Sequence, residues 1–371
     1  MTQLKNIYYL LACIIGACIV SCSDDDDPVL APEVQLSITE SAVTMTMGET
    51  LAFSAQSVNN TVYQETWAVG DSVVSTTSAY KFVPETKGQY ALNYTAVNEG
   101  GAYTFQYTIT VNALLRPITD TSLAYVSQLL EFLPAPGQFI NTTLGNTEGA
   151  EAVIGGNSSL VSLGAWGGSA TYAFDHTVLN VANGNDLVVY GNPMANFAEP
   201  GVIWVMQDEN ANGVADDTWY EIKGSAHDLE GTIRNYSVTY FRPETAADDV
   251  PWEDNQGNSG VVATNIYHTQ AYYPEWIEAD SYTITGTILS SENIDMSNPR
   301  FITSAPFEYG YADNIVGGDE IDLDDAIDAD GNTVILEGID FIKVQTGIQA
   351  NMGWLGELST EVKGIADLSL L

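Results

Sequence analysis

The stretch Val202–Glu221, VIWVMQDENANGVADDTWYE, places a loop of oxygen-bearing side chains between two β-prone runs. Apolar and aromatic residues dominate Val202–Met206 and Thr218–Ile222, so each run predicts a strand. The loop between them is rich in Asp, Asn and Gly, which are the residues that form turns. The stretch therefore predicts a hairpin and favours an all-β fold.

This loop also has the spacing of a calcium site. Alternating oxygen side chains followed by Gly213 match the first half of the calcium-loop pattern D-x-[DN]-x-[DN]-G. The twelfth position is Trp219 rather than the Glu of an EF-hand, and no helical pattern flanks the loop. We expect a structural calcium ion. The alternative is a solvated turn in which the same side chains form Asx-turns. The expected ligands are Asp208, Asn210, Asn212, Val214, Asp216 and Asp217.

The composition is that of an acidic protein built from strands and turns. Its 371 residues, 45% of them hydrophobic, are enough for two or three domains with their own cores. Only 10 Lys and Arg stand against 49 Asp and Glu, a formal net charge of −39. This balance argues against nucleic acid as a partner, because phosphate binding needs clustered basic side chains.

The N-terminus has the pattern of an exported lipoprotein. Residues 1–22 are typical of a signal peptide, with an apolar stretch at Ile7–Val20. The ending Ile19-Val20-Ser21-Cys22 resembles a bacterial lipobox, in which Cys22 receives lipid, and Asp24–Asp27 resembles the surface-export signal of Bacteroidota lipoproteins. We expect a lipid anchor at Cys22 on the outer face of the outer membrane. The alternative is a cleaved secretory peptide with a chance Cys.

After an acidic export signal and tether at residues 23–33, residues 34–113 alternate apolar and polar positions in short runs. This pattern predicts a small β-sandwich of the immunoglobulin kind. The motifs at Trp67–Asp71, Gly88–Tyr90 and Asn98–Gly101 resemble a PKD-like domain, which implies a spacer or adhesive module with Trp67 in its core. The predicted strands are Val34–Ile38, Thr50–Ala55, Glu65–Val69, Ala79–Phe82, Gly88–Val97 and Ala102–Val111.

A linker at residues 114–133 leads to the second domain, residues 134–371. Ser122–Leu133 has apolar residues at helical spacing and predicts one short helix, with a strand as the alternative. The second domain shows no helical period, which predicts a larger jelly-roll-like β-sandwich. A β-propeller is the alternative, although no repeat of about 40–50 residues is found. The predicted strands are Leu160–Leu163, Ala170–Phe174, Asp186–Tyr190, Val202–Met206, Thr218–Ile222, Tyr236–Tyr240, Ser281–Leu289, Asp340–Gln345 and Glu361–Leu368.

Several distinctive motifs lie in the second domain. They are VSLGAWGG at Val161–Gly168, YGNPM at Tyr190–Met194, AEPGVIWVMQDENANG at Ala198–Gly213, PWEDNQGNSG at Pro251–Gly260, HTQAYYPEWIEADSYTITGT at His268–Thr287 and GIDFIKVQTGIQANMGWLGELSTEV at Gly338–Val362. Together they resemble the PKD-like cell-surface lipoproteins of Bacteroidota, which often lie beside TonB-dependent uptake systems. The resemblance implies capture of a small molecule or glycan, with a cobalamin or a polysaccharide as examples, and a TonB-dependent transporter as a partner.

Two aromatic loops form the predicted ligand-binding region. Flat rings beside amide and carboxylate oxygens suit stacking on a sugar or a planar cofactor. The alternative is that these rings fill the end of the sandwich. Trp166 and Trp354 fit either a core or a ligand role. The predicted ligand-binding residues are Trp252, Asn255, His268, Tyr272, Tyr273 and Trp276.

No catalytic motif is recognisable in the chain. Asp175-His176 has neither a G-x-S-x-G nor an H-E-x-x-H motif to accompany it, and among 49 acids some carboxylate pairs lie close by accident. A second acidic turn, Asp328–Asn332, is a hairpin signal that also allows calcium. We expect a ligand-capturing surface lipoprotein that is not an enzyme. The alternatives are an adhesion or structural surface protein without a small ligand and an extracellular glycan hydrolase.

Overall fold

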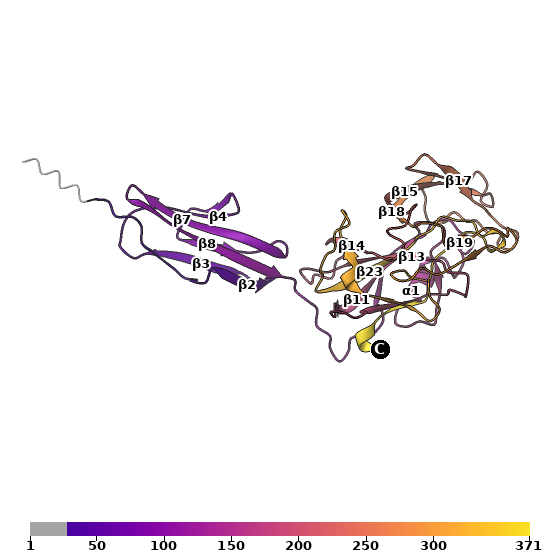
Figure 1. Ribbon diagram of the computed structural model, residues 1–371, viewed down its shortest axis with the longest axis horizontal. Helices are drawn as coiled ribbons and strands as arrows, with labels where there is room; N and C mark the ends of the chain where they lie inside the picture. The colour runs from indigo at the N-terminus through magenta and orange to yellow at the C-terminus, as the bar shows by residue number, and fades with distance from the viewer. Residues whose placement is uncertain (1–27) are drawn as a thin grey trace, which may run out of the picture. The chain divides into compact units, whose positions relative to one another are not determined.

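The structure is a computed structural model that describes residues 28–371, and these residues are almost entirely β (Figure 1). The predicted signal peptide, Cys22 and the acidic run at 24–27 lie outside the described residues. The chain divides into two compact units, the first made mostly of the strands between residues 34 and 112 and the second mostly of those between 128 and 367. The prediction of an all-β protein is confirmed. Among the described residues, no helix is long and apolar enough to cross a membrane.

The first unit consists of two antiparallel sheets. One has the order β1 (Val34–Leu36), β3 (Leu51–Ser57), β6 (Ala79–Phe82). The other has the order β2 (Ala42–Thr46), β8 (Gly101–Asn112), β7 (Gly88–Asn98), β4 (Gln64–Val69), β5 (Ser72–Ser75). Every strand predicted for this unit is present, and β2 and β5 are additional.

Trp67 is the centre of the first unit's core. It is fully buried on β4, with its ring centroid 4.6 Å from that of Tyr94 and 5.7 Å from that of Phe53. Because Phe53 lies on β3, Trp67 joins the inner faces of the two sheets. Its indole Nε1 donates to the carbonyl of Thr77 at 3.0 Å, so its polar atom is satisfied. The prediction that Trp67 fills this core is confirmed.

A six-stranded sheet forms the frame of the second unit. Its order is β22 (Ala326–Ile327), β14 (Trp219–Ile222), β13 (Gly201–Met206), β23 (Gly338–Thr346), β11 (Ser169–Leu179), β9 (Gln128–Leu133). The predicted hairpin is present as β13 and β14, with Met206 opposite Trp219. The helix predicted within 122–133 is wrong, and the alternative of a strand is what the structure has. Gln128–Leu133 pairs with β11 instead, because this edge offers it backbone partners.

Smaller sheets complete the second unit. A three-stranded sheet has the order β21 (Asp319–Ile321), β12 (Leu187–Tyr190), β25 (Gly364–Asp367). A four-stranded sheet, orange in Figure 1, has the order β17 (Ser259–Val262), β16 (Val250–Asp254), β15 (Ile233–Phe241), β18 (Ser281–Ile288). Two strand pairs are β10 (Val161–Ser162) with β24 (Glu361–Val362) and β19 (Ile294–Asp295) with β20 (Thr303–Ser304). The short helices are α1 (Thr147–Glu151), η1 (Leu323–Asp325), η2 (Gly353–Leu355) and η3 (Leu368–Leu370).

Two buried clusters hold these sheets together. Ile203 and Ile342 of the six-stranded sheet share one cluster with Leu187 and Ile365 of the three-stranded sheet, so the two sheets pack face to face. The four-stranded sheet covers a second, aromatic cluster, whose members include Trp166, Tyr240, Tyr272 and Tyr273. Loop residues contribute to both clusters, for example Val153 to the first and Tyr272 to the second.

Candidate functional site

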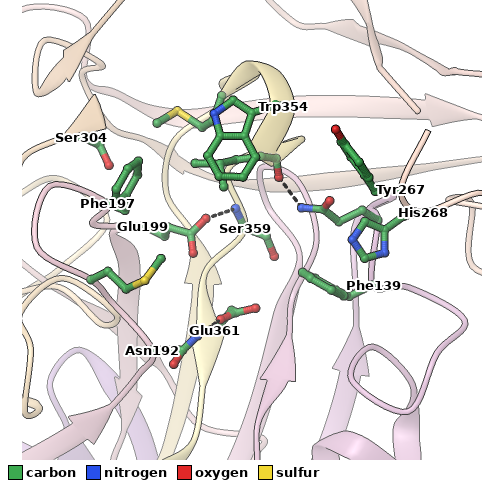
Figure 2. Close-up of a pocket in the computed structure, with 14 residues that line it drawn as sticks. Phe139, Asn192, Phe197, Glu199, Tyr267, His268, Ser304, Trp354, Ser359 and Glu361 are labelled. Carbon is green, nitrogen blue, oxygen red and sulfur yellow. Dashed lines mark hydrogen bonds between the residues drawn. The ribbon is translucent and has the colours of Figure 1, made fainter. Parts of the chain in front are cut away.

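Segments from five parts of the second unit surround a cavity of about 430 Å³, here called the carboxylate cavity (Figure 2). The connections from β12 to β13 and from β23 to β24 supply most of its lining, and the others are the segment after β9, the β17–β18 connection and β20. The lining residues are Gln138, Phe139, Asn192, Met194, Phe197, Glu199, Tyr267, His268, Ser304, Met352, Trp354, Leu355, Ser359 and Glu361.

Two carboxylates, Glu199 and Glu361, lie on one side of this cavity together with Asn192 (Figure 2). The side-chain amide of Asn192 donates to Glu361 at 2.9 Å, and the backbone N–H of Ser359 donates to Glu199 at 3.2 Å. A third carboxylate, that of the fully buried Asp313, accepts from the backbone N–H groups of Glu361 at 2.8 Å and Asn192 at 2.6 Å. The three acids are therefore fixed in position by backbone and amide donors.

Burial raises the pKa of all three carboxyls. The negative charges of Asp313 and Glu361 raise the pKa of Glu199 further, and that of Glu361 acts in the same way on Asp313. None of the described residues that line the cavity is Lys or Arg. Without a cation, these acids hold their protons more tightly than exposed carboxyls do. A positively charged group that enters the cavity would compensate their charge and displace those protons.

Aromatic rings form the rest of the wall. His268 packs edge-on against Phe139, with ring centroids 4.9 Å apart, on the side of the cavity opposite the carboxylates (Figure 2). Tyr267 is 70% exposed and Trp354 is 54% exposed, so both rings are accessible to a ligand. Large aromatic side chains that line a cavity and remain exposed are characteristic of binding surfaces.

The six predicted ligand-binding residues do not form one site. Only His268 lines the carboxylate cavity. Tyr272 and Tyr273 are buried in the aromatic cluster under the four-stranded sheet. The Tyr272 hydroxyl accepts from the backbone N–H of Asn265 at 3.2 Å, and the Tyr273 hydroxyl donates to the carbonyl of Ala279 at 2.8 Å. These two rings fill a core, which was the alternative reading.

The other three predicted residues lie apart from this cavity. Trp252 lines a separate cavity on the four-stranded sheet. The amide of Asn255 donates to the carbonyl of Asn235 at 2.9 Å in a turn, and Trp276, which is 41% exposed, stacks on Phe132 at 6.2 Å. Sequence reasoning missed Glu199, Glu361 and the ligand-facing position of Trp354. Their signal was indirect, because all three lie within the distinctive motifs of the second domain.

The predicted calcium loop folds back on Asp208, whose side chain is buried. Its carboxylate accepts from the backbone N–H groups of Asn212 at 3.0 Å and Gly213 at 2.7 Å. Asn212 in turn accepts from the N–H of Val214 and donates to Asp216 at 3.4 Å. The loop therefore brings its oxygen side chains together. Among the described residues, no group of three or more His, Cys, Asp or Glu side chains has the arrangement of a metal site.

Asp217 and Asn210 complete this loop. Burial raises the pKa of Asp217, and so do the charges of Glu209, Asp208 and Asp216. The side chain of Asn210 accepts from the N–H of Asn212 at 2.9 Å. The loop thus contains both an excess of negative charge and the Asx-turn bonds of the alternative reading.

The second acidic turn is a hydrogen-bonded hairpin. Asp328 accepts from the backbone N–H groups of Asp330 and Asn332, both at 2.9 Å. Hydrogen bonds from Asn332 lower the pKa of Asp328 and keep it ionised. Its oxygens therefore already have protein donors.

His176 is a buried structural residue. Its two ring nitrogens lie 2.7 Å from Asp175 Oδ1 and 2.9 Å from Asp367 Oδ2. Burial alone would lower the pKa of His176, but the hydrogen bonds to Asp367 and Asp175 raise it overall. The pair ties β11 to the end of β25.

Comparison with known proteins gives no family for this chain. No family model matches it, and no curated protein matches it. Solved structures are similar over part of the chain, among them three at 12% identity or less. One is a quinonprotein alcohol dehydrogenase-like protein from Bacteroides thetaiotaomicron VPI-5482, with 12% identity over 63% of this chain and 41% of that chain and a TM-score of 0.21. Another consists of three N-terminal domains of the Highly Immunogenic Outer Capsid protein of bacteriophage RB49, with 12% identity over 63% of this chain and 67% of that chain and a TM-score of 0.18. The third is CBM51-2 in complex with GlcNAc and INT domains from Clostridium perfringens ZmpB, with 8% identity over 90% of this chain and 48% of that chain and a TM-score of 0.15. The chain thus spans less than half the length of the first of these, and TM-scores this low carry no functional argument.

Proposed function

We propose that the second unit binds a small organic cation in the carboxylate cavity, as the ligand-capturing part of a surface lipoprotein. The observation that carries the proposal is that exposed aromatic rings meet the half-buried Glu199 and the buried Glu361 in a cavity whose lining contains no Lys or Arg among the described residues. Aromatic faces and carboxylates both attract a positive charge. A volume of about 430 Å³ suits a small ligand. A small amine or an amino sugar has this chemistry.

The finer architecture belongs to the same proposal. The first unit is a PKD-like immunoglobulin sandwich, supported by its two antiparallel sheets around Trp67. The second is a jelly-roll-like sandwich, supported by the core that its six-stranded and three-stranded sheets share. In this arrangement the first unit is a spacer between the lipid anchor and the binding unit.

The cellular setting we propose rests on the lipobox that ends at Cys22. Lipid on Cys22 places the protein on the outer face of the outer membrane, where a TonB-dependent transporter takes up the captured ligand. Replacing Cys22 with Ala should move the protein out of the membrane fraction and abolish labelling with a fatty-acid precursor. Retention of the label would show that another residue carries the lipid.

We also propose a structural calcium ion in the 208–217 loop. The support is the loop's converging oxygen side chains and the charges that raise the pKa of Asp217. A divalent cation would neutralise this excess charge and hold the β13–β14 connection in one conformation.

Calorimetry with a chosen ligand panel tests the cation site. The mature chain, kept in solution by Cys22→Ser, is titrated with small amines, amino sugars, cobalamins and neutral glycans. We expect an amine-bearing ligand to bind, and Glu199→Gln or Trp354→Ala to weaken that binding at least about tenfold. Trp276→Ala, a surface change outside the cavity, should leave it unchanged. Binding of only cobalamins or neutral glycans would contradict the proposal, and binding of no ligand would favour the adhesion alternative.

A second candidate, a glycoside hydrolase, is favoured by one observation. A general acid needs a raised carboxyl pKa, and burial raises the pKa of Glu199 and Glu361 beside an aromatic wall. Turnover of chromogenic glycosides that is lost in both Glu199→Gln and Glu361→Gln would establish this reaction. A lack of turnover together with amine binding would leave the cation-binding function.

A further inference from the structure

A second cavity of about 230 Å³ lies on the four-stranded sheet, between its β16–β17 hairpin and the segment 349–357. We call it the Trp252 cavity. Trp252 of β16 is paired with Gly260 of β17, and both line the cavity. A Cβ atom on Gly260 would lie 2.6 Å from Trp252 Cζ2, so the absence of a side chain there is what lets the indole lie against the strand. The ring is half-buried and forms one apolar wall.

The other wall carries two buried polar atoms that have no hydrogen-bond partner. These are Glu357 Oε2 and Gln349 Nε2, and both residues line the cavity. Glu357 is only 5% exposed, and its other oxygen accepts from the backbone N–H of Gln138 at 2.7 Å. The amide oxygen of Gln349 accepts from the hydroxyl of Tyr236 at 3.3 Å. Each side chain is therefore held at one polar atom and leaves the other unpaired.

Buried polar groups in folded proteins are nearly always paired, so an unpaired carboxyl oxygen and an unpaired amide N–H in one cavity indicate a ligand that hydrogen-bonds to both. Burial raises the pKa of Glu357 to about 8, so this carboxyl is mostly protonated at neutral pH. No other titratable side chain is among the described residues that line the cavity. The cavity is thus close to neutral, in contrast to the carboxylate cavity.

We propose that the Trp252 cavity binds one neutral sugar ring. A sugar has an apolar C–H face that packs on an indole, and hydroxyl groups that both donate and accept hydrogen bonds. One hydroxyl pairs with Glu357 Oε2 and a neighbouring one accepts from Gln349 Nε2. The volume of about 230 Å³ is below the range of drug-sized ligands, about 300–1,000 Å³, so it holds a single ring, free or as one residue of a longer glycan. This site does not depend on the proposed cation site.

Saturation-transfer NMR on the mature chain with Cys22→Ser tests the site. The probes are glucose, galactose, mannose and N-acetylglucosamine, each with its short oligosaccharides. We expect at least one of them to bind, with the strongest saturation on the ring C–H protons that face the indole. Trp252→Ala and Gln349→Leu should each lower the affinity at least about tenfold, whereas Trp252→Phe, which keeps an aromatic face, should lower it less.

Controls separate this site from the carboxylate cavity and from misfolding. Trp276→Ala, on the surface away from both cavities, should bind sugar as the unchanged protein does, and thermal melts should show that Gln349→Leu remains folded. An amine that occupies the carboxylate cavity should not compete with the sugar. The proposal is overturned if none of the sugars binds. It is equally overturned if a sugar binds but the binding is weakened by Trp354→Ala or Glu199→Gln. In that outcome, folded Trp252→Ala and Gln349→Leu bind the sugar with unchanged affinity.

Discussion

Gly164 and Gly168, in the motif VSLGAWGG, lie where the second unit's backbone passes closest to itself. A Cβ atom on Gly168 would lie 1.8 Å from the carbonyl oxygen of Leu163, and one on Gly164 would lie 2.1 Å from that of Ala135. Gly164 also has a φ of +79°, which side chains disfavour. These contacts hold the turn that precedes β11 and carries Trp166 into the core.

Replacing Gly168 with Ala should therefore destabilise the second unit. The backbone must shift to remove the clash, at a cost of about 1–3 kcal/mol in the free energy of unfolding, measured by urea denaturation. Gly156 is a matched control, since a Cβ atom there has no atom within 4 Å and no positive φ opposes it. Gly156→Ala should change the free energy by less than about 0.5 kcal/mol. Equal effects of the two variants would show that the close approach is not what requires glycine.

The protonation of Glu199 gives the proposed cation site a defined pH dependence. Because burial and the neighbouring acids raise the pKa of Glu199, a bound cation must displace a proton from the cluster. The affinity for an amine should therefore rise between pH 5 and 8 as protons become easier to remove, and calorimetry in two buffers of different ionisation enthalpy should detect proton release. Glu199→Gln should bind more weakly and show a flatter pH profile. Affinity that falls as the pH rises through this range would contradict the carboxylates' role.

At the scale of elements, the β13–β14 connection carries the proposed calcium ion and joins two strands of the six-stranded sheet. Calcium should raise the melting temperature of the second unit, and excess chelator should lower it by several degrees, since a bound ion stabilises only the folded loop. Asp216 is exposed and contributes one weak hydrogen bond to Asn212, so Asp216→Ala should change the metal-free melting temperature little. The same variant should lose the response to calcium. If chelator does not change the melting temperature of the unmutated protein, a structural ion is excluded.

Asp340 of β23 fixes the start of this loop to the sheet. Its carboxylate accepts from the Nε of Arg116 at 2.9 Å, the hydroxyl of Thr177 at 2.7 Å and the backbone N–H of Asp208 at 2.8 Å. Asp340→Ala leaves all three donors unpaired in a buried place and should destabilise the second unit by about 3–5 kcal/mol in urea denaturation. Thr177→Val removes one donor to Asp340 and also the acceptor of the Arg116 backbone N–H, so it should cost about 1–3 kcal/mol. A cost for Asp340→Ala no larger than that for Thr177→Val would show that Asp340 is not the centre of this network.

The strands that sequence predicts and those that it misses differ in burial. Strand β13 is buried on both faces and forms a continuous apolar run that is easily recognised, and β23 keeps Phe341, Ile342 and Val344 close together. By contrast, β16 contains Pro251, Glu253 and Asp254 and has no such run, yet it forms because β15 and β17 supply backbone partners on both sides. The helix expected before Pro134 fails for the same reason. Pairing with a neighbouring strand is decided by tertiary structure and overrides local periodicity.

At the scale of the whole molecule, the carboxylate cavity could not be predicted from the sequence, because its residues lie far apart along the chain. Asn192 and Glu361 are 169 residues apart, yet the side-chain amide of one donates to the carboxylate of the other. The aromatic residues near His268 were grouped by closeness in sequence, whereas burial sends Tyr272 and Tyr273 into the core and leaves His268 at the cavity. Sequence identifies which residue types are suited to a ligand. Which of them meet depends on how the sheets pack.

Acids of the second unit whose pKa is raised by burial set the pH dependence of its folding. Burial raises the pKa of Asp319 to about 7 and of Glu357 to about 8, and it also raises those of Glu199 and Asp313. The folded state thus binds more protons than the unfolded state from about pH 4, where unfolded carboxyls titrate, up to about pH 8. The contribution of these carboxyls to the free energy of unfolding is therefore fully present below their unfolded pKa values. It falls as the pH rises, by up to about 1.4 kcal/mol per pH unit for each group.

We therefore expect the second unit to melt at its highest temperature near pH 5 and at a progressively lower one toward pH 8. Repulsion from the net charge of −39 acts in the same direction, but salt screens charges at the surface far more than buried ones. The decrease in melting temperature from pH 5 to pH 8 should therefore persist in about 1 M NaCl. Glu357→Gln, which removes one of the titrating carboxyls, should flatten the profile. A melting temperature that rises from pH 5 to pH 8 in high salt would show that these acids are already ionised in the folded protein, because only then would the folded state gain no protons over the unfolded one.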